Sequence, residues 1–449
     1  MWRIILVLCA AAAAVDVREA PAVDVREARR SLEAANPFAG LQAQLDGVAA
    51  YFNTSFSLAI RWGSDEASTF AAASGANDRT AHTKMTTASK FPLGSATKTW
   101  TAVAALRANE SGAIDLDGPA APHVDKLLEN TSLEQLYGTD AITFRELLSM
   151  RAGVQDYDDE LFRSKVFAEN ATDYEPLAIV LDANHTLLCQ PGTCGAYSSV
   201  GYVLAGLALA DAAGAATWDG FDQKTAALGD RSNGADFAAT SFPTSGSCAD
   251  AGAIHEYAPA FDETRRRYGF FDIIDDSCLN GWAMGNILTT PSDLASFWYA
   301  LFRSEDLVSA VARRAMTAFA PLTVGWSVGL EYGLGAMLSG YKERSGNWSR
   351  VATLMGHGGE DYGSLAEING FNPALNFSIT LAMGSAVGMN CSNSVGSNYG
   401  AKGQAACYVY DQVLQAISPE IPRLECGVDD TRRRGRRLDP SEDWTCVPF

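Results

Sequence analysis

The chain has 449 residues, of which 47% are hydrophobic and 19% are charged, a composition typical of a folded globular protein with one large or two moderate domains. Its formal net charge of -19 disfavours binding to nucleic acids and to anionic membranes, because both favour basic protein surfaces.

The N-terminal residues have the pattern of a secretory signal peptide. Residues 1–14 contain one basic residue, Arg3, followed by an apolar core and an end of small residues. This segment is too short for a transmembrane helix, and no other stretch is long and apolar enough to span a membrane. The motif Val-Asp-Val-Arg-Glu-Ala then occurs twice within residues 15–36, which predicts a disordered leader before a fold that begins near Pro37.

Hydrophobic periodicity predicts strands near both ends of the chain and helices between them. The expected helices are one that contains Leu41, Leu45 and Val48, and those at 95–109, 143–150, 202–210 and 407–417. The expected strands are 56–62 and 69–73, which form a hairpin, and 364–369 and 377–383, which are joined across the turn 369–373. We therefore expect an α+β fold, in which an antiparallel sheet flanked by helices is built from both chain ends and carries an inserted, mostly helical domain. The main domain is expected over 37–418, with the insertion at roughly 113–280 and a C-terminal tail at 419–449.

Cysteines and glycosylation motifs agree with secretion. Removing the signal peptide removes Cys9 and leaves eight cysteines, an even number. Their grouping suggests the local bridges 189–194, 248–278, 391–407 and 426–446, although spacing leaves other connectivities open. Asn-x-Ser/Thr motifs, more numerous than the roughly three expected by chance, favour a glycosylating pathway. These motifs begin at Asn53, Asn109, Asn130, Asn170, Asn184, Asn347, Asn376 and Asn390. The basic run 432–437 is typical of a solvated tail, with a processing site as the alternative.

The motif that carries chemistry is Ser95-Ala-Thr-Lys98, at the start of the helix predicted for 95–109. Residues three apart on a helix share a face, so the two side chains are expected to meet. A serine hydroxyl needs a base to take its proton, and a desolvated lysine can be neutral enough to do so. The N-terminus of the helix adds a field that favours an oxyanion.

Several segments resemble the β-lactamase-related serine hydrolases, which include class C β-lactamases, D-alanyl-D-alanine carboxypeptidases, D-aminopeptidases and certain esterases. The run from Phe91 through Gly94-Ser-Ala-Thr-Lys98 to Asp117 is similar to the nucleophile region of that family, and Tyr197-Ser-Ser199 is similar to its Tyr-x-Asn element. Further similar segments are 142–154, 286–294, 332–335 and Gly356-His-Gly-Gly359, the last of which resembles the third motif of the family. They occur in the order of the family between about Pro37 and Ile417, and together they imply a serine β-lactamase/penicillin-binding-protein-like fold.

The resemblance implies a role for each matching residue. Ser95 would be the acylated nucleophile, Lys98 and Tyr197 would share the general-base and proton-return work, and His357 would occupy a position held by lysine in the lactamases. A histidine there can donate to the tyrosine oxygen or to substrate and titrates near neutral pH. The oxyanion hole would be made by the backbone N–H groups of Ser95 and Glu360, and neither a metal nor a cofactor is required.

Two departures from the family pattern bear on the substrate. Ser199 stands where asparagine often holds a substrate amide, and its side chain reaches less far. Gly358, followed by Gly359, stands where serine or threonine commonly binds a substrate carboxylate. We therefore expect small esters or amides as substrates and disfavour β-lactams and D-Ala-D-Ala peptides.

Two alternatives remain at this point. A catalytically silent relative would bind a ligand or partner in the same cleft. Gly325-Trp-Ser-Val-Gly329 matches the Gly-x-Ser-x-Gly elbow of α/β-hydrolases, which would make Ser327 the nucleophile, but the residues that follow are a poor helix start. A second Ser-x-x-Lys, Ser339 to Lys342, is interpreted as a surface loop. The histidines outside the third motif show no paired ligand spacing and are interpreted as incidental: His82, His123, His185 and His255.

Overall fold

The structure is a computed structural model that describes residues 24–426, except 35, 53, 64, 66–67, 79, 167–172, 260–269, 305 and 385–397. The predicted signal peptide and the basic run 432–437 therefore lie outside the described residues. The α-helices are α1 (Val25–Ala34), α2 (Leu41–Phe52), α3 (Thr97–Glu110), α4 (Ala121–Leu127), α5 (Leu133–Tyr137), α6 (Phe144–Leu148), α7 (Asp159–Val166), α8 (Pro176–Asp182), α9 (Ser199–Ala212), α10 (Gln223–Leu228), α11 (Cys248–Ala251), α13 (Pro291–Arg303), α14 (Ala310–Met316) and α15 (Asn398–Ile417). Short 3₁₀ turns are η2 (Trp218–Gly220), η3 (Gly229–Asn233), η4 (Ala235–Phe237), η5 (Trp282–Met284) and η6 (Gly325–Ser327).

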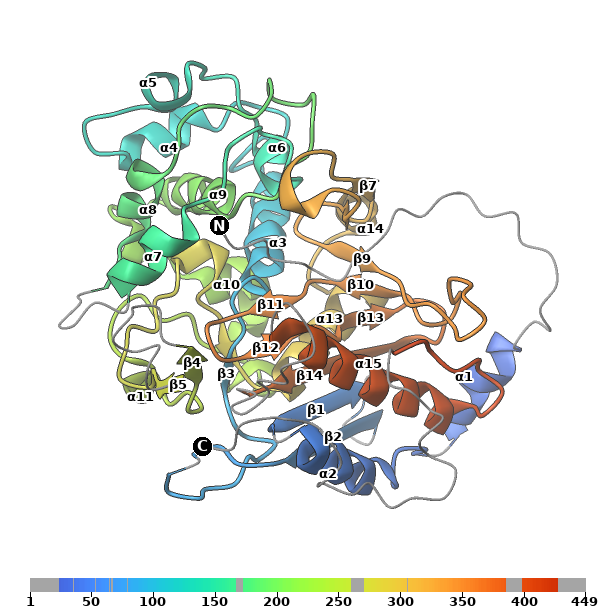
Figure 1. Ribbon diagram of the computed structural model, residues 1–449. Helices are drawn as coiled ribbons and strands as arrows, with labels where there is room; N and C mark the ends of the chain where they lie inside the picture. Colours follow the sequence, from blue (N-terminus) through green and yellow to red (C-terminus); the bar gives the residue numbers. More distant parts are fainter. Residues whose placement is uncertain are drawn as a thin grey trace.

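The main sheet joins strands from both ends of the chain (Figure 1). Its members are β1 (Phe56–Arg61), β2 (Thr69–Ser74), β7 (Ala320–Pro321), β8 (Glu331–Tyr332), β9 (Met337–Ser339), β10 (Leu354–Gly356), β11 (Gly359–Glu360), β12 (Leu365–Ala366), β13 (Asn369–Asn372) and β14 (Phe377–Met383). β1 pairs antiparallel with β2 on one side and with β14 on the other, so the first strand of the domain lies beside the last. Two small pairs complete the strands: β3 (Phe91–Pro92) with β6 (Leu288–Thr289), and β4 (Tyr257–Pro259) with β5 (Phe270–Asp272). The expected α+β fold with an antiparallel sheet is confirmed.

The sheet is covered by helices on both faces, and the central strand β14 shows why. Successive side chains of a strand point to opposite faces. Phe377, Ile379 and Leu381 belong to the core shared with α2 and α15. The intervening Ser378 faces α13, where its hydroxyl donates to the Ala295 carbonyl at 2.6 Å. Because both faces are covered, every residue of β14 is buried, including the polar Ser378 and Thr380.

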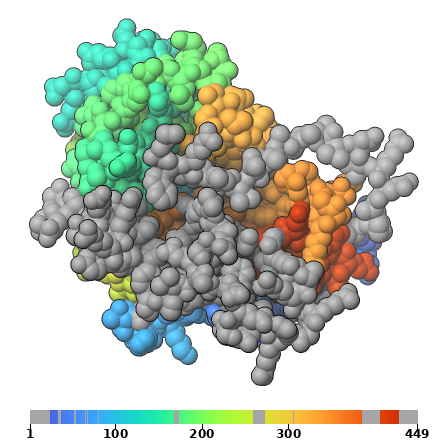
Figure 2. All heavy atoms as spheres, in the orientation of Figure 1, coloured from blue at the N-terminus to red at the C-terminus, as the bar shows by residue number. Residues whose placement is uncertain are grey.

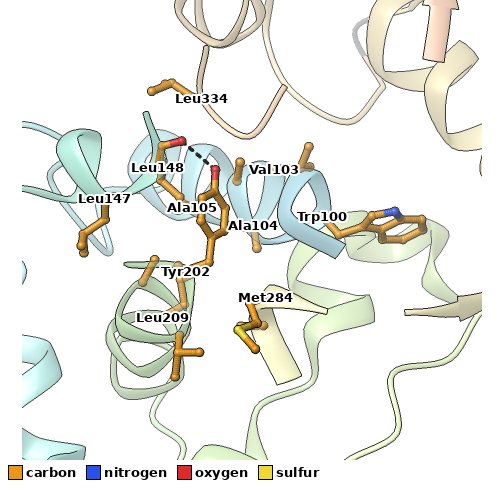
Figure 3. Close-up of a cluster of buried hydrophobic side chains, with 14 of the residues drawn as sticks. Trp100, Val103, Ala104, Ala105, Leu147, Leu148, Tyr202, Leu209, Met284 and Leu334 are labelled. Atoms are coloured by element: carbon orange, nitrogen blue, oxygen red, sulfur yellow. Dashed lines mark hydrogen bonds between the residues drawn. The ribbon is translucent and has the colours of Figure 1, made fainter. Parts of the chain in front are cut away.

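A second core joins the sheet to a helical lobe that contains α4 to α9, seen as the teal and green residues at the top of Figure 2. At its centre α3 packs against α9. Figure 3 shows Tyr202 of α9 between these helices, with its hydroxyl directed at the Leu148 carbonyl, to which it donates at 2.6 Å. Trp100 of α3 stacks on Phe297 of α13, with ring centroids 4.0 Å apart. Residues 97–106 of α3 are all buried. None of the helices in the described ranges combines the length and apolarity that a membrane crossing requires.

The structure corrects three sequence predictions near the chain ends. Residues 25–34 of the expected disordered leader form α1, whose Ala28 and Leu32 are buried against the core of α15. Part of the expected C-terminal tail is folded, since Ile421 and Leu424 are buried in the same core. Residues 369–372, expected as a turn, are strand β13 and pair with β14, so the hairpin turns after Asn372 instead.

Disulfide bonds within the described residues join Cys189–Cys194, Cys248–Cys278 and Cys407–Cys426. The first two are the bridges expected from spacing. The third corrects the expected pairs 391–407 and 426–446, whose other members, Cys391 and Cys446, lie outside the described residues. The bond ties the segment 421–426 to α15, where Ile421 and Leu424 are buried.

Candidate active site

The turn before α3 exposes one side chain in an otherwise buried segment. Residues 91–106 are all buried except Ser95, which is half-buried. Gly94 has a φ of +44°, and a Cβ there would lie 1.8 Å from the carbonyl oxygen of Glu360, so this position needs glycine. The turn therefore presses against β11 and directs Ser95 outward at the junction of sheet and helical lobe.

Lys98 lies one helical turn after Ser95, as the spacing predicts. Its Nζ lies 2.8 Å from Ser95 Oγ and 2.9 Å from the carbonyl oxygen of Met284, to which it donates. The residue is 1% exposed. Burial lowers the pKa of Lys98 to about 7, while the negative charge of Asp156 acts in the opposite direction. A substantial fraction of Lys98 is therefore neutral near pH 7, where an amine can accept a proton.

Tyr197 completes a hydrogen-bonded trio, because its hydroxyl donates to Ser95 Oγ at 2.9 Å. The loop before it is closed by the Cys189–Cys194 bond and held by the Ala196 N–H, which donates to the Met150 carbonyl at 2.8 Å. Burial raises the pKa of Tyr197 well above its usual value. Its phenol therefore stays protonated and acts as a hydrogen-bond donor.

His357 differs from the expectation in both its partner and its charge. It lies between β10 and β11 and is 1% exposed. Its Nδ1 lies 2.5 Å from the Gly358 carbonyl, which can only accept, so Nδ1 carries the hydrogen. Its Nε2, 3.0 Å from the Tyr332 hydroxyl, then accepts from Tyr332, while its ring centroid lies 6.3 Å from that of Tyr197. Burial, together with the positive charge of Lys98, lowers the pKa of His357 to about 3, which keeps it neutral instead of titrating near pH 7.

The expected substrate-binding positions fall into two groups. Gly359 and Glu360 form β11, directly against the turn that carries Ser95: a Cβ at Gly359 would lie 1.9 Å from the Leu93 carbonyl oxygen. Gly358 has room, since its Cβ would meet its nearest neighbour at 3.6 Å. Ser199 is buried at the start of α9, where its N–H donates to Asp156 Oδ1 at 2.8 Å.

The comparison with known sequences agrees with this arrangement, since a sequence model of the Beta-lactamase family matches residues 46–388, most of the chain. The chain belongs to the Beta-lactamase family. That family consists of serine hydrolases, so the protein is a serine hydrolase by membership, as the motifs indicate.

Solved structures with low sequence identity to this chain share its fold. The D-amino acid amidase of Ochrobactrum anthropi SV3, complexed with L-phenylalanine amide, is 22% identical with a TM-score of 0.63, over 86% of this chain and 99% of that one. A D-stereospecific amidohydrolase from Streptomyces sp. is 23% identical with a TM-score of 0.59, over 78% and 94%. A penicillin binding protein from Bacillus halodurans is 18% identical with a TM-score of 0.57, over 83% and 98%.

The two competing serine motifs, those of Ser327 and of Ser339 to Lys342, lie in structural elements of the protein. Ser327 ends the 3₁₀ turn η6, is 4% exposed, and uses its Oγ to accept the Tyr197 N–H at 3.2 Å. No helix follows it, so the elbow geometry is absent there. Ser339 ends strand β9, and the Lys342 ammonium stands over the Trp348 ring at 5.5 Å.

Sequence reasoning missed four groups at this site. Asp156 follows the matched segment 142–154 by two residues, and Tyr332 was part of a matched segment without a role. The Met284 carbonyl carries no residue-type signal, because any residue can supply a carbonyl. Trp326 is 51% exposed, with its ring centroid 5.0 Å from that of Tyr197, and the sequence presents it only as part of the elbow motif.

Proposed function

We propose that the chain is a secreted serine hydrolase that forms an acyl-enzyme on Ser95 and acts on small amides or esters. The observation that carries the proposal is the position of Ser95 Oγ, within 2.9 Å of both the Lys98 amine and the Tyr197 hydroxyl. Covalent catalysis by a serine requires a general base within hydrogen-bond distance of the serine hydroxyl.

In the proposed reaction, neutral Lys98 takes the proton of Ser95 as Oγ bonds to the substrate carbonyl carbon. The carbonyl electron pair moves to oxygen and returns as the bond to the leaving group breaks. The proton then passes from Lys98, through the Tyr197 hydroxyl, to the departing amine or alcohol. Water repeats the sequence on the ester of Ser95 and restores the enzyme. We assign the base to Lys98 rather than to a tyrosinate, because burial raises the pKa of Tyr197 well above its usual value.

The developing oxyanion would face the backbone N–H groups of Ser95 and Glu360. The close approach of Glu360 to Gly94 supports this assignment, since it puts the β11 backbone beside the nucleophile turn. His357 has no direct contact with Ser95 in this scheme. It would act by holding Tyr332 and the β10–β11 connection in place.

The substrate class follows from the rim of the site and from the relatives. Trp326 offers an exposed aromatic face next to Tyr197, which favours substrates with an apolar or aromatic group. Two structural relatives are described as a D-amino acid amidase and a D-stereospecific amidohydrolase, which makes D-amino-acid amides the first amides to try. Gly358 supplies no hydroxyl for a substrate carboxylate.

The test is turnover by the purified full chain and its Ser95→Ala variant on p-nitrophenyl butyrate, D-phenylalanine amide and L-phenylalanine amide. We expect turnover of at least one compound by the wild type and its loss, by more than about 10³-fold, in the variant. Equal turnover in both proteins would refute Ser95 as the nucleophile. An inactive wild type that still binds these compounds would support the silent relative.

Secretion is supported by the disulfide bonds and by the glycosylation motifs. Three disulfide bonds are typical of an oxidising compartment. Of the glycosylation motifs, Asn130, Asn184 and Asn347 are exposed. Expression of the full chain in a eukaryotic host should release protein that lacks the signal peptide and loses mass on treatment with an N-glycosidase. Retention of residues 1–14 in an unglycosylated intracellular product would contradict secretion.

A further inference from the structure

Asp156 joins the loop after α6 to the start of the helix that follows Tyr197. Its Oδ1 accepts the Ser199 N–H at 2.8 Å and the Tyr157 N–H at 3.1 Å. The preceding residue strengthens this junction, because the Gln155 carbonyl accepts the Ser198 hydroxyl at 3.2 Å. Tyr197 lies immediately before these two serines, so the carboxylate of Asp156 helps to determine where the phenol of Tyr197 stands.

The same carboxylate acts on the charge of Lys98. Burial raises the pKa of Asp156, and the positive charge of Lys98 acts in the opposite direction and favours the carboxylate. Asp156 in turn is the anion that opposes the effect of burial on the pKa of Lys98. Within the described part of the chain, the other titratable side chains that interact with this pair are neutral: Tyr197 before α9, Tyr202 in α9, Tyr157 before α7, and His357. Two of the charged residues of α7, Asp159 and Arg163, act on Tyr157.

We propose that Asp156 is a positioning residue that sets the protonation state of Lys98 through its charge and the place of Tyr197 through its hydrogen bond to Ser199. The inference rests on the proposed function, in which Lys98 is the base. It assigns two separable roles to one side chain. The charge governs the pH at which the base becomes available, and the hydrogen bond governs how fast the assembled site works.

Asp156→Asn separates the two roles, because the amide oxygen can still accept the Ser199 N–H while the charge is gone. Without the anion, Lys98 releases its proton at lower pH. The acidic limb of the pH profile of kcat/KM for p-nitrophenyl butyrate is therefore expected to move down by about one pH unit. Asp156→Ala removes the hydrogen bond as well, and its plateau value of kcat is expected to fall by about 10-fold or more, with the Asn variant restoring most of it.

Asp158→Asn is the matched control. Asp158 is exposed two residues away, and its Oδ1 caps α7 by accepting the Leu161 N–H at 2.9 Å, a role that asparagine also fills. This variant also loses one negative charge, but at an exposed position that does not act on Lys98. The acidic limb of its pH profile should therefore coincide with that of the wild type.

Each outcome decides one point. An acidic limb of Asp156→Asn that coincides with the wild type and with Asp158→Asn overturns the electrostatic role. A full plateau in Asp156→Ala overturns the positional role. In both cases the loss of turnover in Ser95→Ala would leave the proposed function standing, whereas turnover that does not depend on Ser95 would overturn the function and the inference together.

Discussion

Replacing Gly359 by alanine should separate strand β11 from the turn that carries Ser95. The new Cβ would lie 1.9 Å from the Leu93 carbonyl oxygen and 3.0 Å from the Ala96 nitrogen. Carbon and oxygen atoms that are not bonded approach to about 3.3 Å, so β11 or the turn must move by about 1.4 Å. Both contacts are with backbone, which cannot swing aside as a flexible side chain does.

The magnitude follows from this displacement. Overpacking of this kind costs about 1–3 kcal/mol of stability. With an unfolding entropy of about 2.1 cal/mol/K per residue, a chain of this length would lose about 1–3 °C in Tm. The effect on turnover is larger, because a shift of about 1 Å at a catalytic group can lower kcat/KM by about 10²-fold. Glu360, the proposed oxyanion donor, would move together with Gly359.

The assay combines a thermal melt with kcat/KM for p-nitrophenyl butyrate. Gly47→Ala is the control, since Gly47 lies in α2 with no atom within 4 Å of its Cβ position. That variant should keep the wild-type rate and an equal or slightly higher Tm, because alanine favours a helix over glycine. A Gly359→Ala protein with the Tm and kcat/KM of the wild type would refute the close approach of β11 to the nucleophile turn.

Three further outcomes are expected. The pKa of Lys98 is lowered to about 7 and that of His357 to about 3. The value of kcat/KM should therefore rise as one group loses its proton near pH 7, with no further change above pH 5 from the titration of His357. A flat profile from pH 5 to 9 would contradict Lys98 as the base. Trp326→Ala should reduce kcat/KM for aromatic acyl esters relative to acetyl esters by about 3- to 10-fold, whereas Val328→Ala, similarly exposed in the same loop, should leave this ratio unchanged. If both variants gave the same ratio, Trp326 would not contact the substrate. Gly358→Ser should fold normally, since the nearest atom lies 3.6 Å from the new Cβ, and should lower KM for carboxylate-bearing substrates by about 10-fold; an unchanged KM would show that the substrate carboxylate does not reach this position.

The sequence predicted those parts of the site that depend on local geometry. Ser95 and Lys98 are three residues apart, and the pitch of a helix alone brings their side chains together. The hairpin of β1 and β2 follows from alternation across a short turn, and its pairing is confirmed. The Cys189–Cys194 bridge spans only five residues, so few alternatives compete with it.

Tertiary structure alone decided the contacts between distant segments. Asp156 meets Ser199 across 43 positions, and His357 meets Tyr332 across 25, and neither partner can be read from spacing. The spacing of the cysteines allows several partners for Cys407. Its partner is Cys426 because the segment 421–426 packs against α15. The charge states at the site depend on burial as well. The sequence alone gives no reason to expect an unusual pKa for Lys98 or His357. In the folded protein both side chains are buried away from the water that stabilises their charged forms, and this lowers both pKa values.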